Sequence, residues 1–410
     1  MNPRHSGQPS ERRSDESRPG EARPSEAKPG QAKPGEAKPG QGKPRPSVLL
    51  VGAHGYGRGY LDRLARLHAA GRIRLAGVAD PRPLDPEQRA LAGDAAYGPD
   101  AAALIAAIEP GVVVVATPVH THVDLAVAAL RSGAHVLLEK PPAPTLDGLG
   151  RLLAAQRDAG RACQVGFQAL GSGAVTELTR QIGAGRYGRI TGIGVTGLWW
   201  RDEEYWGRAG WAGRRRLDGR AVNDGALTNP FAHGVALALR LDGSGGDEPV
   251  RGVVLDTYRT RAAEAHDTAS ARIVTARGTP VTVAVTLCAQ PPVEPAVTVY
   301  GSLGTAVLHY TEDRLSTPDG TSEHQRADLL ENLLDHVADP AVPLLVPLAE
   351  TLAFTQVAEA VHESPAPVEV AQQALTGLPE LTRRAAATGR LYHELGADWA
   401  HAEPFTWTPS

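Results

Sequence analysis

Three residues of the chain are of types that suit proton handling at a carbon–oxygen bond. Lys140 lies in the turn Glu139-Lys140-Pro141, where an ammonium can bind a hydroxyl and stabilise a developing alkoxide. Asn229 and His233 are four residues apart, a spacing that places two side chains on one face of a helix. Histidine titrates near neutral pH, so His233 is a candidate general acid and base. Taken alone, such a lysine is more often a solvated loop residue, and such a histidine a structural one.

A glycine-rich turn follows the first apolar run of the chain, 48–51, which is typical of a buried parallel strand. The turn contains Gly52, His54, Gly55, Tyr56 and Gly57. A dinucleotide-binding turn needs glycine for the bend, for close approach of pyrophosphate and for helix packing. Gly52 and Gly57 hold the outer positions, whereas His54 takes the middle one. An ordinary glycine-rich turn between strand and helix is the alternative interpretation.

The second strand ends at Asp80. A carboxylate at this position can accept both ribose hydroxyls of a dinucleotide and repel a 2′-phosphate, which favours NAD over NADP. Arg82, two residues later, could accept that phosphate, so NADP stays open as the second cofactor. A turn-forming aspartate before Pro81 is the structural alternative.

Two more turns follow buried strands, after 112–116 and after 135–138. Ligands of α/β proteins bind at the carboxyl ends of parallel strands. We therefore assign to the cofactor site, besides the glycine turn and Asp80, the residues Thr117, Pro118, His120, His122, Glu139 and Lys140. His120 is expected to line the nicotinamide pocket. The two histidines have no Cys, Asp or Glu in the same turn, so no metal site is predicted.

The elements that must position these residues change in character along the chain. Residues 1–46 repeat a Lys-Pro-Gly-rich unit with few apolar side chains, which predicts a disordered tail. Strands and helices alternate over 47–166, which predicts a Rossmann-type domain with a doubly wound parallel sheet. Over 167–410 strands follow one another through short turns, which predicts an α+β domain with a large, mostly antiparallel sheet.

Hydrophobic periodicity gives the expected bounds of these elements. The expected strands are 48–51, 73–79, 112–116, 135–138, 191–197, 250–258, 268–275, 281–287, 296–300 and 305–310. The expected helices are 60–70, 100–108, 122–132, 175–183, 230–239, 325–337, 347–362 and 379–389.

Composition excludes several classes of function. A formal net charge of −4 gives no electrostatic case for a nucleic-acid partner. No apolar run reaches the length of a membrane span, and the N-terminus lacks the apolar segment of a secretory signal. Cys163 and Cys288 lie far apart in apolar contexts, so we expect two small buried side chains and a cytoplasmic protein.

An aromatic stretch that is also rich in charged residues precedes the Asn229 segment. It contains Trp199, Trp200, Arg201, Tyr205, Trp206 and Trp211. Such surfaces stack on the faces of sugars and bond to their hydroxyls, although tryptophan clusters are more often simple packing.

These motifs together resemble the Gfo/Idh/MocA oxidoreductases, the family of glucose–fructose oxidoreductase and inositol dehydrogenase. The resemblance runs from Val48 to about Trp399. It includes the glycine turn, 116–122, the segment 165–168 and the turn 301–305. The Glu-Lys-Pro element at 139–141 is its most specific part.

The resemblance implies a Rossmann domain followed by a sheet domain that binds substrate and often forms the oligomer interface, so a homodimer or homotetramer is expected. It also implies NAD as the cofactor, with Lys140 and His233 flanking the substrate at the nicotinamide. Many members carry Asp at the position of Asn229. An amide orients a hydroxyl but cannot relay a proton, which puts the usual Lys-Asp-His path in doubt here.

The expected activity is hydride transfer between nicotinamide and a secondary alcohol or ketone of a sugar, sugar derivative or cyclitol. Two alternatives remain on the same scaffold, an NAD-dependent glycosidase and a non-catalytic cofactor-binding regulator. Net consumption of NAD distinguishes the first activity from the other two. Release of sugar without net NADH distinguishes the glycosidase from the regulator.

Overall fold

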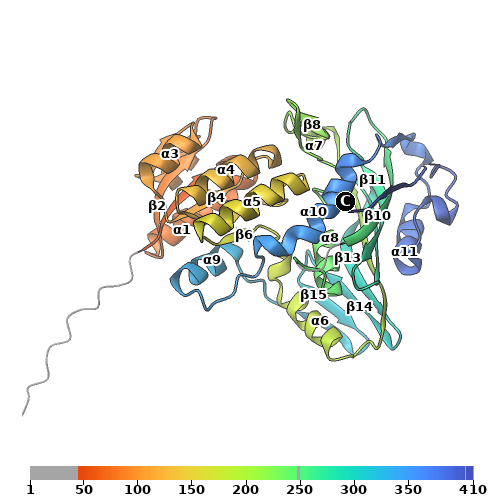
Figure 1. The fold of residues 1–410 in the computed structure, drawn as a ribbon. Coiled ribbons are helices and arrows are strands. Elements are labelled where there is room, and N and C mark those ends of the chain that lie inside the picture. Colours follow the sequence, from red (N-terminus) through yellow and green to blue (C-terminus); the bar gives the residue numbers. More distant parts are fainter. Residues whose placement is uncertain (1–44, 247–249, 402, 410) are drawn as a thin grey trace, which may run out of the picture. The chain divides into compact units, whose positions relative to one another are not determined.

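The computed structural model describes residues 45–246, 250–401 and 403–409. The predicted tail at 1–46 therefore lies almost entirely outside the described residues. From Arg45 onward the contacts of the chain form one unit (Figure 1).

The N-terminal part is built on a parallel six-stranded sheet with the order β3-β2-β1-β4-β5-β6. The strands are β1 (Ser47–Val51), β2 (Arg74–Ala79), β3 (Ala96–Gly98), β4 (Val112–Val115), β5 (His135–Leu138) and β6 (Cys163–Val165). β1, β4 and β5 are continuous apolar runs and are buried almost throughout, as central parallel strands require. Because all six strands are parallel, the turns after β1, β4 and β5 meet at one edge of the sheet.

Helices connect these strands, as the predicted alternation requires. They are α1 (Tyr56–Ala69), α2 (Pro86–Ala92), α3 (Ala101–Ile108), α4 (Val119–Arg131) and α5 (Leu146–Ala159). Leu61, Leu64 and Leu67 form the buried stripe of α1, at the helical spacing that predicted it. Helices α3, α4 and α5 pack side by side (Figure 1).

The C-terminal part is built on a ten-stranded sheet with the order β16-β15-β14-β13-β7-β12-β11-β10-β17, and β18 pairs with β10. The strands are β7 (Ile190–Trp200), β10 (Val250–Arg259), β11 (Thr268–Thr275), β12 (Pro280–Thr286), β13 (Cys288–Gly301), β14 (Gly304–His309), β15 (Arg314–Thr317), β16 (Gly320–Glu323), β17 (Val368–Glu369) and β18 (Phe405–Trp407). Neighbours are antiparallel except β7 with β12 and β10 with β17. The predicted α+β domain with a mostly antiparallel sheet is confirmed.

The remaining elements are mainly helical. They are α6 (Gly173–Gly183), α7 (Glu203–Gly207), the hairpin β8 (Arg216–Leu217) and β9 (Arg220–Ala221), α8 (Ala232–Asp242), α9 (Leu329–Ala338), α10 (Leu352–Glu363), α11 (Leu378–Thr388), and short 3-10 turns at Gln168–Gly171, Leu348–Thr351, Gln372–Ala374 and His393–Leu395. Of these, α9 returns to the first sheet and packs on β5. The Gln164 side chain donates to the Leu329 carbonyl (2.6 Å) and accepts from the Val346 amide (3.0 Å), which ties β6 to this returning segment.

Helices of this chain pack against both faces of the large sheet near β7. Alternate residues of a strand point to opposite faces, and two glycines of β7 show what lies on each. A Cβ on Gly197 would lie 2.3 Å from the ring of Phe231, which precedes α8. A Cβ on Gly194 would lie 2.7 Å from Ala386 in α11. The α11 face has its own small core, which includes Tyr258, Leu378, Tyr392 and Trp399.

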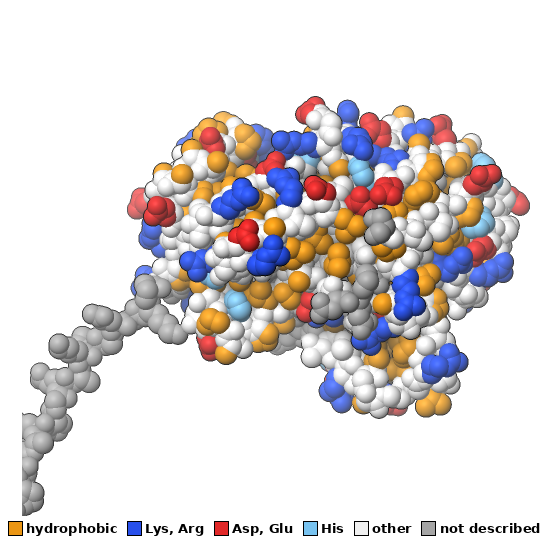
Figure 2. All heavy atoms as spheres, viewed as in Figure 1, with side chains coloured by type: hydrophobic (Ala, Val, Ile, Leu, Met, Phe, Trp, Pro, Cys, Tyr) orange, Lys and Arg blue, Asp and Glu red, His pale blue; other side chains and the backbone are white. Residues whose placement is uncertain are grey.

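The expected burial of the two cysteines is confirmed. Cys163 and Cys288 are buried and unpaired with each other. Among the described residues, no helix is both long and apolar enough to cross a membrane. The face drawn in Figure 2 carries basic and acidic side chains interspersed with one another.

Candidate functional site

The glycine turn after β1 packs tightly on the end of β4. A Cβ on Gly52, where φ is +90°, would lie 2.5 Å from the carbonyl oxygen of Ala116. A Cβ on Gly57 would lie 2.0 Å from the carbonyl oxygen of Gly52. Both outer positions therefore require glycine. Helix α1 follows with no side-chain cap and no acidic residue in its first turn, so its amino end suits an anion.

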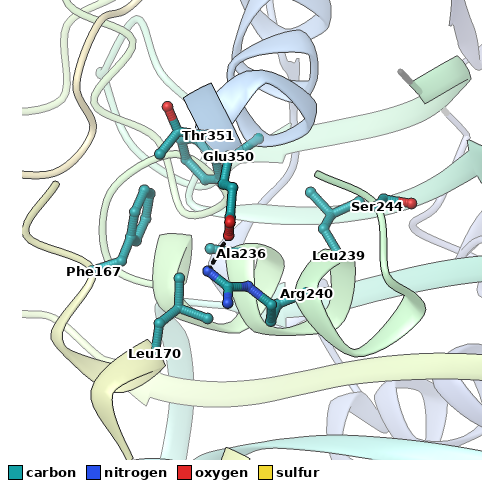
Figure 3. Close-up of a pocket in the computed structure, with 9 residues that line it drawn as sticks. Phe167, Leu170, Ala236, Leu239, Arg240, Ser244, Glu350 and Thr351 are labelled. Carbon is teal, nitrogen blue, oxygen red and sulfur yellow. Dashed lines mark ion pairs between the residues drawn. The ribbon is translucent and has the colours of Figure 1, made fainter. Parts of the chain in front are cut away.

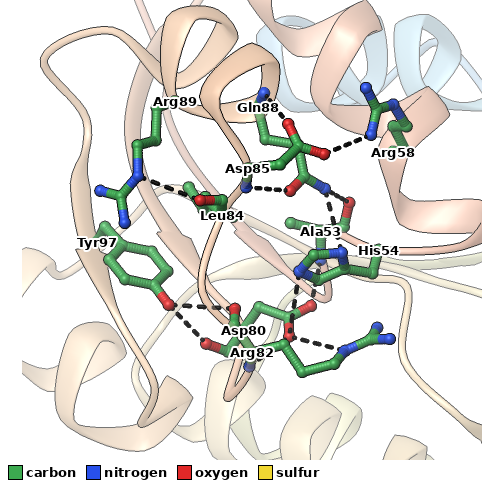
Figure 4. Close-up of polar contacts among 10 residues, drawn as sticks. All are labelled: Ala53, His54, Arg58, Asp80, Arg82, Leu84, Asp85, Gln88, Arg89 and Tyr97. Carbon is green, nitrogen blue, oxygen red and sulfur yellow. Dashed lines mark hydrogen bonds and ion pairs between the residues drawn. The ribbon is translucent and has the colours of Figure 1, made fainter.

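Asp80, at the end of β2, is buried and already bonded to backbone amides (Figure 4). Its Oδ2 accepts from the Ala53 amide (2.8 Å), and its Oδ1 accepts from the Arg82 amide (2.9 Å). The His54 ring lies between Asp80 and Gln88, with Nε2 at 4.0 Å from Asp80 Oδ1. His54 thus covers the carboxylate that we assigned to the ribose.

Glu139 is buried just after β5, where its carboxylate accepts hydrogen bonds from three segments of the chain. Its Oε1 accepts from the Tyr60 hydroxyl (2.7 Å) and from Gln168 Nε2 (2.8 Å), and its Oε2 accepts from the Lys140 amide (3.0 Å). A Cβ on Gly166 would lie 2.6 Å from Glu139 Oε1, so the segment after β6 passes against this carboxylate. Burial raises the pKa of Glu139, and these bonds oppose the rise. These contacts indicate that Glu139 stabilises the turn that contains Lys140.

Lys140 reaches from the end of β5 to the segment before α8. Its Nζ donates to Asn229 Oδ1 (2.7 Å) and to the Asn229 carbonyl oxygen (3.0 Å). Burial lowers the pKa of Lys140, while the charges of Glu139 and Asp224 oppose that shift. An ammonium has three donors. In the part of the chain that the structure describes, the third donor of Lys140 has no acceptor.

Asp224 is the residue that sequence reasoning missed. Asn229 Nδ2 donates to Asp224 Oδ1 (2.5 Å), which fixes the amide with its oxygen toward Lys140. Asp224 is buried, pairs with Arg208 (2.9 Å) and accepts from the Gly213 amide (2.8 Å). A carboxylate therefore lies behind Asn229, one side chain further from Lys140 than an aspartate at 229 would be.

Asn229 and His233 do not share a helical turn as predicted from their spacing, because α8 begins only at Ala232. Pro230 follows Asn229 directly, and the residue before a proline is disfavoured in helices. His233 is the second residue of α8, and its ring meets Phe167 edge-on with centroids 5.8 Å apart. Its Nδ1 is buried and has no hydrogen-bond partner among the described residues. Burial, and then the positive charge of Lys140, lower the pKa of His233 to about 3, so the ring is neutral.

His122 and His120 have different surroundings. His122 is buried in α4, with Nδ1 at 2.8 Å from the Pro141 carbonyl oxygen and Nε2 at 2.7 Å from that of Thr117. It thus joins the turns after β4 and β5. Burial lowers the pKa of His122 to about 4, and the two carbonyl groups oppose the shift. His120 is half-buried, and its Nδ1 has no partner among the described residues.

Two hollows formed by the described residues do not include Lys140. A cavity of about 10 Å³, the size of one water molecule, lies behind Phe167 beside the ion pair Arg240–Glu350 (Figure 3). A wider cleft of about 910 Å³ includes His135 and His336. It flanks the amino end of β5, whereas Lys140 follows the carboxyl end. Neither hollow contains an assigned site residue.

Family models match both parts of this fold. Residues 47–167 match the oxidoreductase family with an NAD-binding Rossmann fold, and residues 175–307 match the GFO/IDH/MocA C-terminal domain. The chain belongs to the Gfo/Idh/MocA family. The resemblance drawn from the Glu-Lys-Pro element and the glycine turn is thereby confirmed.

Individual relatives of this Gfo/Idh/MocA chain are dehydrogenases by name. It is 37% identical over 145 residues to inositol 2-dehydrogenase 4 of Saccharopolyspora erythraea, covering 34% of this chain and 43% of that protein. It is 32% identical over 141 residues to 1-carboxy-3-chloro-3,4-dihydroxycyclohexa-1,5-diene dehydrogenase of Comamonas testosteroni, covering 34% and 36%. The chain thus spans less than half the length of these curated relatives.

Solved structures share the fold across both parts. The WlbA dehydrogenase of Bordetella pertussis, solved with NADH and UDP-GlcNAcA, is 24% identical with a TM-score of 0.64, covering 77% of this chain and 94% of that one. UDP-N-acetylglucosamine 3-dehydrogenase GnnA of Acidithiobacillus ferrooxidans is 18% identical with a TM-score of 0.61, covering 78% and 96%. At these identities the likeness concerns the fold alone.

The residues present fit the dinucleotide that the Gfo/Idh/MocA domain binds. The close packing at Gly52 and Gly57 forms the turn, and the uncapped start of α1 suits pyrophosphate. Asp80, which we assign to the ribose, is bonded to the Ala53 amide of this turn, and His54 covers it. Among the described residues, no cluster of three or more potential metal ligands was found.

We predict that His54→Gly tightens NADH binding severalfold. The substitution removes a ring from above Asp80 and a Cβ from the position where backbone approaches pyrophosphate. Fluorescence titration with NADH and NADPH, on the wild type and the variant, measures the change. The gain should be larger for NADH, because Asp80 repels a 2′-phosphate. Weaker NADH binding by the variant would show that His54 holds the cofactor.

A second prediction concerns His266, which accepts a hydrogen bond from the segment that leads to Asn229. Its Nε2 accepts from the Leu227 amide (3.1 Å), and burial lowers its pKa to about 3. Between the unfolded pKa of 6.5 and the folded one of about 3, only the unfolded chain binds this proton. The free energy of unfolding should therefore fall as the pH falls through that range.

His266→Gln keeps an acceptor for the Leu227 amide and removes the titrating ring. Its unfolding free energy should fall less steeply with decreasing pH, by up to about 1.4 kcal/mol per pH unit. Urea unfolding at several pH values from about 7 down to about 4 measures both slopes. Equal m values for the two proteins control for the surface exposed. Equal pH slopes would contradict the prediction.

Proposed function

We propose that the protein is an NAD-dependent oxidoreductase that transfers a hydride between nicotinamide and a secondary alcohol or ketone of a sugar, sugar derivative or cyclitol. The observation that carries the proposal is Lys140, whose ammonium is held by Asn229 at the carboxyl edge of the Rossmann sheet with one donor to spare. The names of the inositol dehydrogenase relatives support a polyhydroxylated substrate.

Lys140 holds the reacting oxygen in this proposal. When bound, NAD supplies a hydride acceptor at nicotinamide C4. The free N–H of Lys140 donates to the substrate hydroxyl and stabilises the negative charge that develops as the C–H bond breaks. Asn229 keeps the ammonium in place through two acceptors, so the remaining donor has a fixed direction.

His233 exchanges the hydroxyl proton in this proposal. Oxidation of a CH–OH group releases one proton from the hydroxyl, and the neutral imidazole is able to accept it. A developing alkoxide beside the ring raises the imidazole pKa, because a nearby negative charge favours the protonated form. Asn229 takes no part in the proton transfer, since a carboxamide is neither an acid nor a base at neutral pH.

We predict that Lys140→Met and His233→Ala each lower kcat by about 10²- to 10⁴-fold, the usual contribution of acid–base groups. The Kd for NADH should change little, because neither side chain belongs to the glycine turn. Steady-state reduction of NAD+ against a panel of polyols and sugars gives the rates, and NADH titration gives the Kd. Lys140→Arg, which keeps a cation, serves as the matched variant. Unchanged kcat in both Lys140→Met and His233→Ala, on a substrate that the wild type oxidises, would contradict the mechanism.

A further prediction concerns variants in which the carboxylate of Asp224 and the amide of Asn229 exchange positions. Asn229→Asp alone should lower kcat/KM, because the new carboxylate would lie against Asp224 at the present 2.5 Å contact. Adding Asp224→Asn should restore part of the loss, since an amide again donates to a carboxylate. A double-mutant cycle should give a coupling energy of about 1–3 kcal/mol. Additive losses would show that the two side chains act independently.

A further inference from the structure

A row of stacked arginines and aromatic rings lies beside the Lys140 site. We call Trp199, Arg201, Tyr205, Arg208 and Trp211 the arginine–aromatic wall. Arg201 Cζ lies 4.6 Å from the ring centre of Trp199 and 5.2 Å from that of Tyr205. Arg208 Cζ lies 3.8 Å from the centre of Tyr205 and 4.6 Å from that of Trp211. Two guanidinium groups thus alternate with three rings.

The wall meets the residues around Asn229 at two points. The ring of Trp199 stacks on Phe231, the residue before α8, with centroids 4.8 Å apart. Arg208 pairs with Asp224, whose carboxylate accepts from the Asn229 amide. Because Asn229 holds Lys140, the wall borders the place where the substrate oxygen is held in the proposed function.

Arg201 differs from the neighbouring arginines in the charge of the groups around it. Arg208 has Asp224 at 2.9 Å, and the neighbouring Arg261, which lies over Trp206, has Glu203 at 2.9 Å. Among the described residues, no carboxylate lies within 4.0 Å of Arg201. Among the described residues, its guanidinium donates to a neutral group, the Trp200 carbonyl oxygen (3.3 Å).

Arg201 also keeps a donor without a partner. Its Nε is buried and has no hydrogen bond among the described residues. A half-buried cation with an unsatisfied N–H bears a desolvation cost that an anion would remove. The rings of Trp199 and Tyr205 contact the guanidinium and restrict its movement, so less freedom is lost when a ligand binds.

We propose that Arg201 binds an anionic group of the substrate, a carboxylate or a phosphate, so that the substrate is an acidic sugar or cyclitol derivative. The inference rests on the proposed dehydrogenase function. A guanidinium presents parallel donors that match either anion.

The test compares matched neutral and acidic compounds on the full chain with NAD+. Glucose, glucuronate and glucose 6-phosphate differ at one carbon, and their comparison separates carboxylate from phosphate. The wild type should prefer one of the acids. Arg201→Met, which keeps apolar contact with the rings, should lower kcat/KM for that acid by about 10- to 100-fold, mainly through KM. The neutral sugar should change less than about twofold.

Two controls distinguish anion binding from packing and from net charge. Arg131→Met removes the same charge from an exposed site at the far end of α4, about 17 Å along the helix from His120, and should leave the acid preference unchanged. Arg201→Lys keeps the charge and should retain part of the preference. Calorimetric titration of the wild type and Arg201→Met with each acid, in the presence of NADH, measures binding without turnover.

The outcomes separate this inference from the proposed function. Absence of NAD+ reduction with these compounds and with the whole panel of polyols and sugars would overturn the dehydrogenase, and the calorimetry would then decide on Arg201 alone. Equal use of neutral and acidic compounds, or an Arg201→Met loss of the same size for both, would overturn the inference and leave the dehydrogenase standing. Loss of acid binding confined to Arg201→Met supports it.

Discussion

The bond between Lys140 and Asn229 is the contact on which the arrangement of the site depends. A partly buried ammonium needs acceptors, and in the described structure both come from one residue on the far side of the junction between the two sheets. The position of α8 and that of the β5 turn are thereby linked at one point. With two of its N–H groups bonded to Asn229, Lys140 has a third N–H that points away from Asn229. A group that binds a hydroxyl oxygen requires such a donor.

Charge around this lysine is supplied from two sides by buried carboxylates. Glu139 lies beneath the turn, tied to Tyr60 and Gln168, and Asp224 lies behind Asn229, tied to Arg208. Neither carboxylate bonds to the ammonium itself, yet both oppose the lowering of its pKa by burial. The two carboxylates thus favour the charged form of Lys140, while the group in direct contact with the ammonium is a neutral amide.

Much of the scaffold could be predicted from the sequence because its signals are local. Buried parallel strands such as 112–115 are continuous apolar runs, and the stripe of α1 has helical spacing. The prediction placed the start of α1 at Tyr60, four residues late, because two glycines in its first turns are poor helix formers. The helix begins at Tyr56 because the positive φ of Gly55, +57°, completes the turn before it.

By itself the sequence determined the parallel sheet, the glycine turn and the placing of Lys140 after a buried strand, since each depends on residues close together in the chain. Only the tertiary structure decided what Lys140 bonds to. Asn229 is 89 residues away, and Asp224 could be linked to it only once the turn before α8 was folded. The covering of Asp80 by His54 was likewise undecided, because the orientation of a side chain at a turn depends on the neighbours that packing brings to it.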